Sequence, residues 1–189
     1  AMEGNTAKRK LGLNSHVILF FGFVRKYKGL EYLIRAMPEV LRRSQVKLLI
    51  VGEFWEDKEP YLKEIEALGL QGNVEVVDRY VPNEEVGLYF SAADVVVLPY
   101  VDATQSAIVS LAYAFDKPVI TTHVGGLPEV VSDGETGFIV PPGDSQALAA
   151  AMVKYFEGDY ASRFTANVKI QKNALSWEAL VRLIEDFSQ

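Results

Sequence analysis

Short apolar runs alternate with amphipathic segments along nearly the whole chain, and this alternation restricts the fold more than any other feature. The runs are rich in β-branched and aromatic residues, and we predict strands at 16–23, 47–51, 74–77, 95–98, 118–122 and 137–140. Apolar residues at helical spacing predict helices at 30–43, 58–68, 83–92, 105–115, 127–131, 144–155, 160–174 and 176–187. Asn83 is a candidate cap for the third of these helices. Strands that alternate with helices form βαβ units. The sequence therefore predicts an α/β fold: a Rossmann-like, doubly wound parallel sheet of about six strands with helices on both faces.

Length and charge narrow the class of protein. The chain has 189 residues, which fits one domain with a sizeable core. We interpret residues 1–15 as a leader, with Ala1 as a cloning remnant ahead of Met2, and residues 159–189 as C-terminal helices. The net charge of −6 argues against a nucleic-acid partner. With no cysteine and only 2 histidines far apart, we expect neither a disulfide nor a metal site.

The apolar runs are too short for a membrane protein. None approaches the ~20 residues that a transmembrane helix needs. The N-terminal segment also lacks the apolar core of a signal peptide. We therefore expect no transmembrane segment and a cytoplasmic location.

A cluster of cations follows the first predicted strand. Arg25, Lys26 and Lys28 lie between that strand and its helix, and Gly29 comes directly before the helix. The free N–H groups and the dipole at a helix N-terminus favour anions, and a glycine lets the backbone come close to a ligand. The segment is therefore a candidate phosphate-binding loop. The alternative is a solvated basic loop.

A second candidate phosphate loop follows the fourth predicted strand. Thr104, Gln105, Ser106 and Ala107 open a helix, where polar side chains and free backbone N–H groups can meet an anion. The alternative is an ordinary helix cap by Thr104 or Ser106, which is compatible with phosphate binding. Both loops leave the carboxyl ends of parallel strands, which is the edge where open α/β sheets bind ligands.

Three more turns follow strands of the predicted sheet. They are Gly52 with Glu53 after the second strand, Arg79 with Tyr80 and Val81 after the third, and Gly125 with Gly126 after the fifth. Tyr80 can offer an aromatic face to a ligand, and a buried aromatic at the sheet edge is an equal alternative. The glycine pair is equally consistent with a structural turn and with a turn that faces a ligand.

Several of these pieces together carry a family likeness. Lys28-Gly29, the run KPVI from Lys117 and the run VGGLPEVV from Val124, in this order and spacing, resemble the C-terminal half of a GT-B glycosyltransferase. The likeness is to the retaining, glycogen-synthase-like glycosyltransferase family 4 (group 1). It extends from Val17 to Trp177 and so covers nearly the whole chain.

The resemblance implies roles for the candidate residues. Lys28 would grip the diphosphate of a nucleotide-sugar donor, together with Gly29 and the loop at 104–107. The turns at 52–53 and 79–81 would wrap the nucleoside, and the glycine pair at 125–126 would face the sugar side of the cleft. Family members usually carry an arginine at the position of Phe23, and Arg25 is the candidate replacement.

One departure from the family pattern concerns its pair of glutamates. On this chain they fall at Ala103 and Leu111, so both are absent. The surrounding residues resemble a divergent subgroup in which the first glutamate, a donor-sugar contact, is missing too. Gln105 or Ser110 is a candidate for part of that contact.

The resemblance implies one half of a hexosyltransferase. This half would bind a nucleoside diphosphate sugar, and the enzyme would transfer the hexose to an unknown acceptor with retention of configuration at the anomeric carbon. Its partners would be the donor and an N-terminal GT-B domain, with no cofactor or metal. The 189 residues alone would transfer no sugar. Peripheral attachment to a membrane is compatible with this reading. The missing glutamates leave open a non-catalytic nucleotide or sugar-phosphate-binding module, and a nucleotide-sugar epimerase-like half is a further alternative.

Overall fold

The computed structural model describes residues 2–174 of the 189-residue chain. Its strands are β1 (His16–Phe21), β2 (Val46–Val51), β3 (Val74–Val77), β4 (Val95–Leu98), β5 (Val119–Thr122) and β6 (Gly137–Val140). Its helices are α1 (Gly4–Lys10), α2 (Leu30–Arg43), α3 (Glu59–Ala67), α4 (Asn83–Ala92), α5 (Ala107–Ala114), α6 (Leu127–Val130), α7 (Ser145–Glu157) and α8 (Tyr160–Ala174), with a short 3-10 helix, η1 (Lys26–Lys28). Each predicted element within this range is confirmed to within two residues at each end. The helix predicted at 176–187 lies outside the described residues.

The six strands form one parallel sheet in the order β3-β2-β1-β4-β5-β6. This is the doubly wound arrangement that the sequence predicts. β2 pairs with one side of β1, and β3 pairs with β2 at the sheet edge. β4 then pairs with the other side of β1, and β5 and β6 follow outward from β4. The strand order therefore reverses between β1 and β4, and the crevice outside their carboxyl ends is the topological switch point where such sheets bind ligands.

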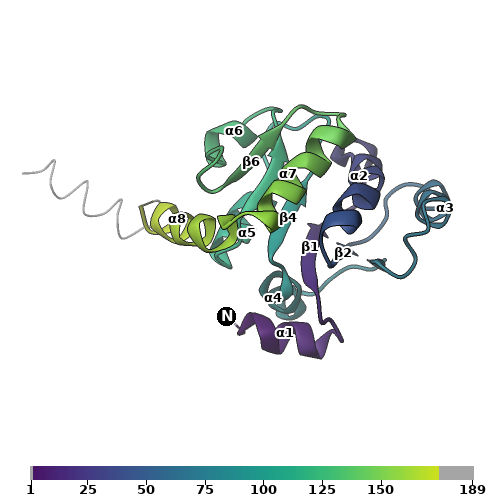
Figure 1. The fold of residues 1–189 in the computed structure, drawn as a ribbon, viewed down its shortest axis with the longest axis horizontal. Coiled ribbons are helices and arrows are strands. Elements are labelled where there is room, and N and C mark those ends of the chain that lie inside the picture. Colours follow the sequence, from purple (N-terminus) through teal and green to yellow (C-terminus); the bar gives the residue numbers. More distant parts are fainter. Residues whose placement is uncertain (1, 175–189) are drawn as a thin grey trace, which may run out of the picture.

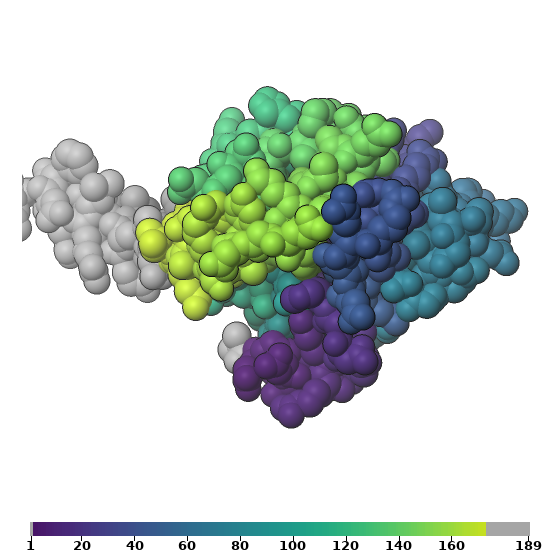
Figure 2. Space-filling model, in the orientation of Figure 1, coloured from purple at the N-terminus to yellow at the C-terminus, as the bar shows by residue number. Residues whose placement is uncertain are grey.

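Alternate side chains of the central strand supply a core on each face of the sheet. Ile18 and Phe20 of β1 pack with α2, α3 and α7, whereas Val17, Leu19 and Phe21 pack with α4, α5 and α6. Helices thus lie on both faces (Figure 1). On one of these faces α2 and α7 lie side by side, and α8 continues next to α7 (Figure 2). Burial on both faces explains why the strands are almost continuously apolar.

The interpretation of residues 1–15 as a leader is wrong for residues 4–10. These residues form α1, which packs against α4 at one end of the sheet (Figure 1). Ala7 is fully buried there, and Lys8 Nζ lies 2.6 Å from Asp94 Oδ2. The segment has no apolar stripe at helical spacing, so its sequence pattern did not reveal a helix.

The predicted capping role of Asn83 is also wrong. Asn83 is the first residue inside α4, and the N-cap is the extended Pro82. The Pro82 carbonyl accepts hydrogen bonds from the N–H groups of Glu85 and Val86, so the helix begins one residue earlier than a cap at Asn83 requires. The acidic first turn of this helix is as predicted.

Candidate functional site

The loops after β1 and β4 are joined at the switch point. The Val101 N–H donates a hydrogen bond of 2.8 Å to the carbonyl of Tyr27. Gly29 has a φ of 64°, and a Cβ at this position would lie 2.1 Å from the Pro99 carbonyl oxygen. Only glycine allows this approach. The two loops predicted to bind phosphate therefore form one connected surface.

Lys28 is a buried cation in this surface. Lys28 as a whole is only 7% exposed, and its amine makes no hydrogen bond or ion pair with any residue from 2 to 174. Gly22, directly after β1, leaves room for the amine, because a Cβ there would lie 2.9 Å from Lys28 Nζ. Burial, followed by the nearby charge of Arg25, lowers the pKa of Lys28 to about 8. A buried charge without a partner is costly, so this position favours an anionic ligand.

A pocket of about 290 Å³ opens beside Lys28. It contains every residue predicted on the nucleoside side: Gly52, Glu53, Arg79, Tyr80 and Val81. The structure therefore brings Lys28 and the two turns that were predicted to wrap a nucleoside to the same pocket. Tyr80 is 62% exposed, which excludes the alternative of a buried edge aromatic.

Arg25 lies at the rim, outside the residues that line this pocket. Its guanidinium carbon lies 4.3 Å from the centroid of the Trp55 ring. The Trp55 ring is in turn 4.3 Å from that of Phe23, and both rings are exposed. The aromatic pair therefore positions the guanidinium next to the pocket rather than in it.

The second loop predicted to bind phosphate caps α5. Ser106 Oγ accepts a hydrogen bond of 3.3 Å from the Ile108 N–H, which confirms the capping alternative. The Ala107 N–H donates no hydrogen bond within residues 2–174 and remains free for a ligand. Thr104, Gln105 and Ala107 are exposed. Capping by Ser106 thus leaves one backbone donor of the first turn available.

Tyr100 connects the two phosphate loops and was not predicted. Its ring centroid lies 5.7 Å from Lys28 Nζ, and its hydroxyl lies 3.4 Å from Ser106 Oγ. Burial raises its pKa to about 12, so the hydroxyl keeps its proton at neutral pH. An aromatic residue directly after Leu98 and Pro99, where a buried strand ends, was the available signal.

The glycine pair packs against the second loop. The Gly126 N–H donates a hydrogen bond of 2.8 Å to the Thr104 carbonyl. Gly125 has a φ of 48°, and a Cβ there would lie 1.7 Å from the Ala103 carbonyl oxygen. Neither glycine is among the residues that line the pocket of Lys28. Their evident contribution is to hold the loop at 103–105 in place.

Several residues that line the pocket were not predicted as site residues. They are Phe21, Gly22, Phe23, Asn83, Val86, Ile108 and Leu111. Leu111 is one of the two positions at which the sequence resemblance leads us to expect glutamate. The spacing of Ile108 and Leu111 on α5, three residues apart, was the signal that they share one helix face.

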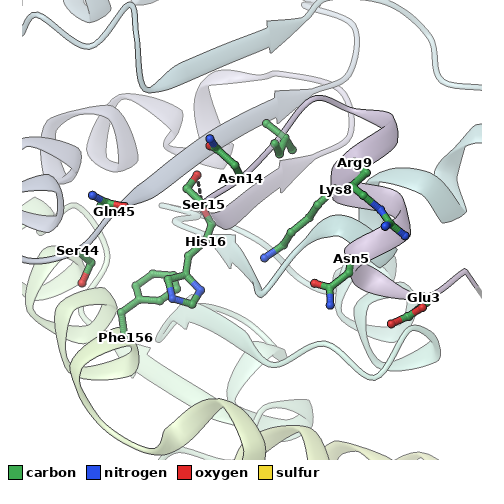
Figure 3. A pocket seen from close by; sticks show the side chains of 11 residues that line it. Glu3, Asn5, Lys8, Arg9, Asn14, Ser15, His16, Ser44, Gln45 and Phe156 are labelled. Carbon is green, nitrogen blue, oxygen red and sulfur yellow. Dashed lines mark hydrogen bonds between the residues drawn. The ribbon is translucent and has the colours of Figure 1, made fainter.

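A larger hollow lies at the opposite edge of the sheet. It has a volume of about 800 Å³ and is lined by α1, the start of β1 and part of α7 (Figure 3). Its lysine, Lys8, is paired with Asp94 at 2.6 Å, and His16 lies against Phe156 with ring centroids 5.3 Å apart. Because the lysine already has a partner and ligands of open α/β sheets bind at the other edge, we place the functional site at Lys28.

Two observations concern metals and membranes. Among residues 2–174, no three His, Asp or Glu side chains come together in a way that could hold a metal ion. In the same part of the chain, no helix combines the length and apolarity needed to cross a bilayer.

The fold and the switch-point pocket define a Rossmann-like, doubly wound α/β protein, and a family model narrows this class. The model of the glycosyl transferases group 1 matches residues 15–157. The chain therefore belongs to the group 1 glycosyl transferases. It is 30% identical over 188 residues to D-inositol 3-phosphate glycosyltransferase of Corynebacterium diphtheriae, covering 95% of this chain and 44% of that protein. The chain thus spans less than half the length of this relative.

Solved structures share the fold. Sucrose-phosphate synthase from Thermosynechococcus elongatus has a TM-score of 0.81 and 28% identity, over 98% of this chain and 48% of that one. The Anabaena protein HepE, solved in complex with UDP-glucose, has a TM-score of 0.81 and 22% identity, over 97% of this chain and 51% of that one. The predicted Rossmann-like half is therefore the observed fold.

Proposed function

We propose that this chain is the nucleotide-sugar-binding half of a retaining glycosyltransferase of family 4, in the divergent subgroup without the paired glutamates. The full protein would move a hexose from a nucleoside diphosphate sugar to an acceptor. The observation that carries the proposal is Lys28: the residue is buried, and its amine, without a counter-ion among residues 2–174, lines a pocket that also contains Gly52 and Val81.

The chemical task of this half is electrostatic. Negative charge develops on the diphosphate as it leaves the sugar, and fixed donors aimed at that charge lower the barrier. Lys28, the rim guanidinium of Arg25 and the free N–H of Ala107 would supply those donors, and the proposal requires no metal or cofactor. The nucleoside would lie toward Gly52 and Val81, and the sugar toward the loop at 104–106.

The names of similar proteins support the ligand class. HepE was solved with UDP-glucose, and the corynebacterial relative is named as a glycosyltransferase acting on D-inositol 3-phosphate. The acceptor and much of the reaction geometry would come from an N-terminal GT-B domain. Positioning supplies on the order of 7–11 kcal/mol of catalysis. These 189 residues alone would then bind donor without transferring sugar, in a protein that we place in the cytoplasm.

A non-catalytic nucleotide-binding module is the second candidate. The observation in its favour is the apolar face of α5, because Leu111 lines the pocket where the family pattern has a carboxylate. The two candidates share the ligand and differ in turnover by the full-length protein with its acceptor.

A thermal-shift panel tests the proposed ligand. The purified chain is heated with nucleosides, nucleoside diphosphates and their sugars, all at one concentration, a hundred times the Kd expected for a nucleoside diphosphate. A bound ligand at that concentration raises the free energy of unfolding by about 2.7 kcal/mol. We expect the diphosphates and their sugars to stabilise the chain more than the nucleosides. Equal, negligible shifts for all of them would overturn the proposal.

A further inference from the structure

Backbone hydrogen bonds continue past the end of the sheet and fix the position of Trp55. The segments that follow β1 and β2 remain side by side, with a parallel bridge between Val24 and Phe54. The Val24 N–H donates a hydrogen bond of 2.9 Å to the Glu53 carbonyl, and the Trp55 N–H donates one of 3.1 Å to the Val24 carbonyl. The two loops therefore form a short extension of the sheet rather than independent turns.

The side chains of this extension alternate between the core and the solvent. Val24 is fully buried, whereas Phe23 and Arg25 on either side of it are exposed. Both exposed side chains reach the indole of Trp55. The Phe23 ring centroid and the Arg25 guanidinium carbon each lie 4.3 Å from the Trp55 ring centroid. A tryptophan face attracts a guanidinium at this distance, so the indole limits the orientations of Arg25.

The guanidinium of Arg25 has no polar partner on the described part of the chain. No hydrogen bond or ion pair joins it to a residue from 2 to 174, so its N–H groups are available to a ligand. Its charge also contributes to the lowered pKa of Lys28, after the larger effect of burial, so the two cations repel each other. Neither forms an ion pair within residues 2–174. Two such cations near each other favour a ligand with more than one negative charge.

The two cations differ in their position relative to the pocket. Lys28 lines the pocket together with the turns at 52–53 and 79–81, whereas Arg25 lies at the rim. A nucleoside in this pocket carries its first phosphate directly and its second phosphate farther out. The rim guanidinium therefore suits the outer phosphate, where its planar set of N–H donors can bind two oxygens at once.

We propose that Trp55 is a positioning residue that holds the Arg25 guanidinium toward the outer phosphate, and that it thereby sets the preference of this site for diphosphates over monophosphates. The indole acts through Arg25 and not through contact with the ligand. A guanidinium that is already restrained loses less conformational freedom on binding than a free arginine side chain does. The inference rests on the proposed function and adds to it a residue outside the pocket.

Calorimetric titration with a nucleoside diphosphate and the matching monophosphate tests the proposal, with the base that stabilises the chain most in the thermal-shift panel. The ratio of the two Kd values measures the preference. We expect Arg25→Met to reduce the preference for the diphosphate about tenfold. Trp55→Leu should reduce it about fivefold, and Trp55→Phe, which keeps an aromatic face, should stay within about twofold of the unchanged chain. Lys26→Met, at an exposed cation of the same loop, is the control and should leave the ratio unchanged.

A double variant separates positioning from a merely structural role. Once Arg25 is replaced by methionine, Trp55→Leu should change the ratio no further, because its effect passes through the guanidinium. An unchanged ratio in Trp55→Leu, or a further loss in the double variant, overturns the inference and leaves the proposed function standing. Failure of the unchanged chain to bind any diphosphate overturns both. Trp55 is 52% exposed, so the variants should fold, and circular dichroism checks this. Trp55→Met, which also lacks an aromatic face, serves if Trp55→Leu does not fold.

Discussion

At the amino edge of the sheet, Asp94 gathers partners from three separate elements. Its carboxylate accepts hydrogen bonds of 2.6 Å from both Lys8 Nζ and the Val17 N–H, and its carbonyl accepts one of 2.8 Å from the Tyr155 hydroxyl. At the carboxyl edge, Lys28 is more deeply buried than Lys8 and has no such partner among residues 2–174. At the amino edge, an ion pair therefore connects secondary-structure elements. At the carboxyl edge, the charge of Lys28 has no counter-ion among residues 2–174.

The difference between Asp94 and Lys28 indicates that one edge of the sheet contributes to stability and the other to ligand binding. A satisfied buried network stabilises the fold, whereas a buried unpaired cation costs stability and is retained where a ligand completes it. Substitutions at Asp94 should therefore change the free energy of unfolding, and substitutions around Lys28 should change ligand affinity. Measuring both quantities on the same variant tests this separation.

The largest effect is expected for Asp94→Ala. It removes the acceptor of Lys8 and of the Val17 N–H, and the loss of hydrogen bonds to a charged group should lower the free energy of unfolding by about 2–3 kcal/mol. Urea denaturation measures it. Asp102→Ala, at an exposed aspartate whose side chain makes no hydrogen bond or ion pair within residues 2–174, is the matched control and should change stability little. A folded Asp94→Ala chain that loses diphosphate affinity by the same amount would contradict the separation.

Next in size is Ala107→Pro. Proline removes the free N–H of the first turn of α5, and the preceding Ser106 is already extended, with φ −139° and ψ 113°, as proline requires. We expect diphosphate affinity to fall by about 1.5 kcal/mol, the contribution of a hydrogen bond to a charged group. Ala107→Ser keeps the N–H and should bind as the unchanged chain does. Equal calorimetric affinities for the two variants would place the phosphates away from α5.

The pH dependence of ligand affinity should be slightly smaller than the effect of Ala107→Pro. Lys28 has a pKa of about 8 in the free protein, so its amine loses the proton as the pH rises from 7 to 9. Phosphate binds the protonated form, and affinity for a nucleoside diphosphate sugar should fall roughly tenfold over that range. Nucleoside affinity should stay constant. If both ligands lost affinity in parallel, a group other than Lys28 would be responsible.

The smallest effect concerns stability at the carboxyl edge. Folding lowers the pKa of Lys28, so the protonated amine destabilises the folded state, fully below pH 8 and progressively less as the pH rises toward 10.5. Lys28→Met keeps the length of the side chain without the charge and should raise stability at pH 7 by about 1 kcal/mol. Thermal unfolding at pH 7 and at pH 10 tests the sign, because the gain should shrink at the higher pH.

The sequence predicted those features that depend on local pattern. The alternation of strands and helices was sufficient for the sheet, and the position of Lys28 after the first strand was sufficient to place it at the switch point. The sequence pattern could not predict α1, because this short polar segment is held by contacts to α4 and Asp94. Nor could it predict the contact of Tyr100 with Lys28, since that contact depends on how two loops distant in the chain pack together.

The central claim is that Lys28 is held for the diphosphate of a nucleotide, and calorimetric titration of Lys28→Met tests it most directly. The matched control is Lys26→Met, at an exposed cation of the same turn. We expect Lys28→Met to weaken nucleoside diphosphate binding by about 1.5–3 kcal/mol, with nucleoside binding unchanged and Lys26→Met close to the unchanged chain. A Lys28→Met chain that binds the diphosphate as tightly as the unchanged chain would contradict the account.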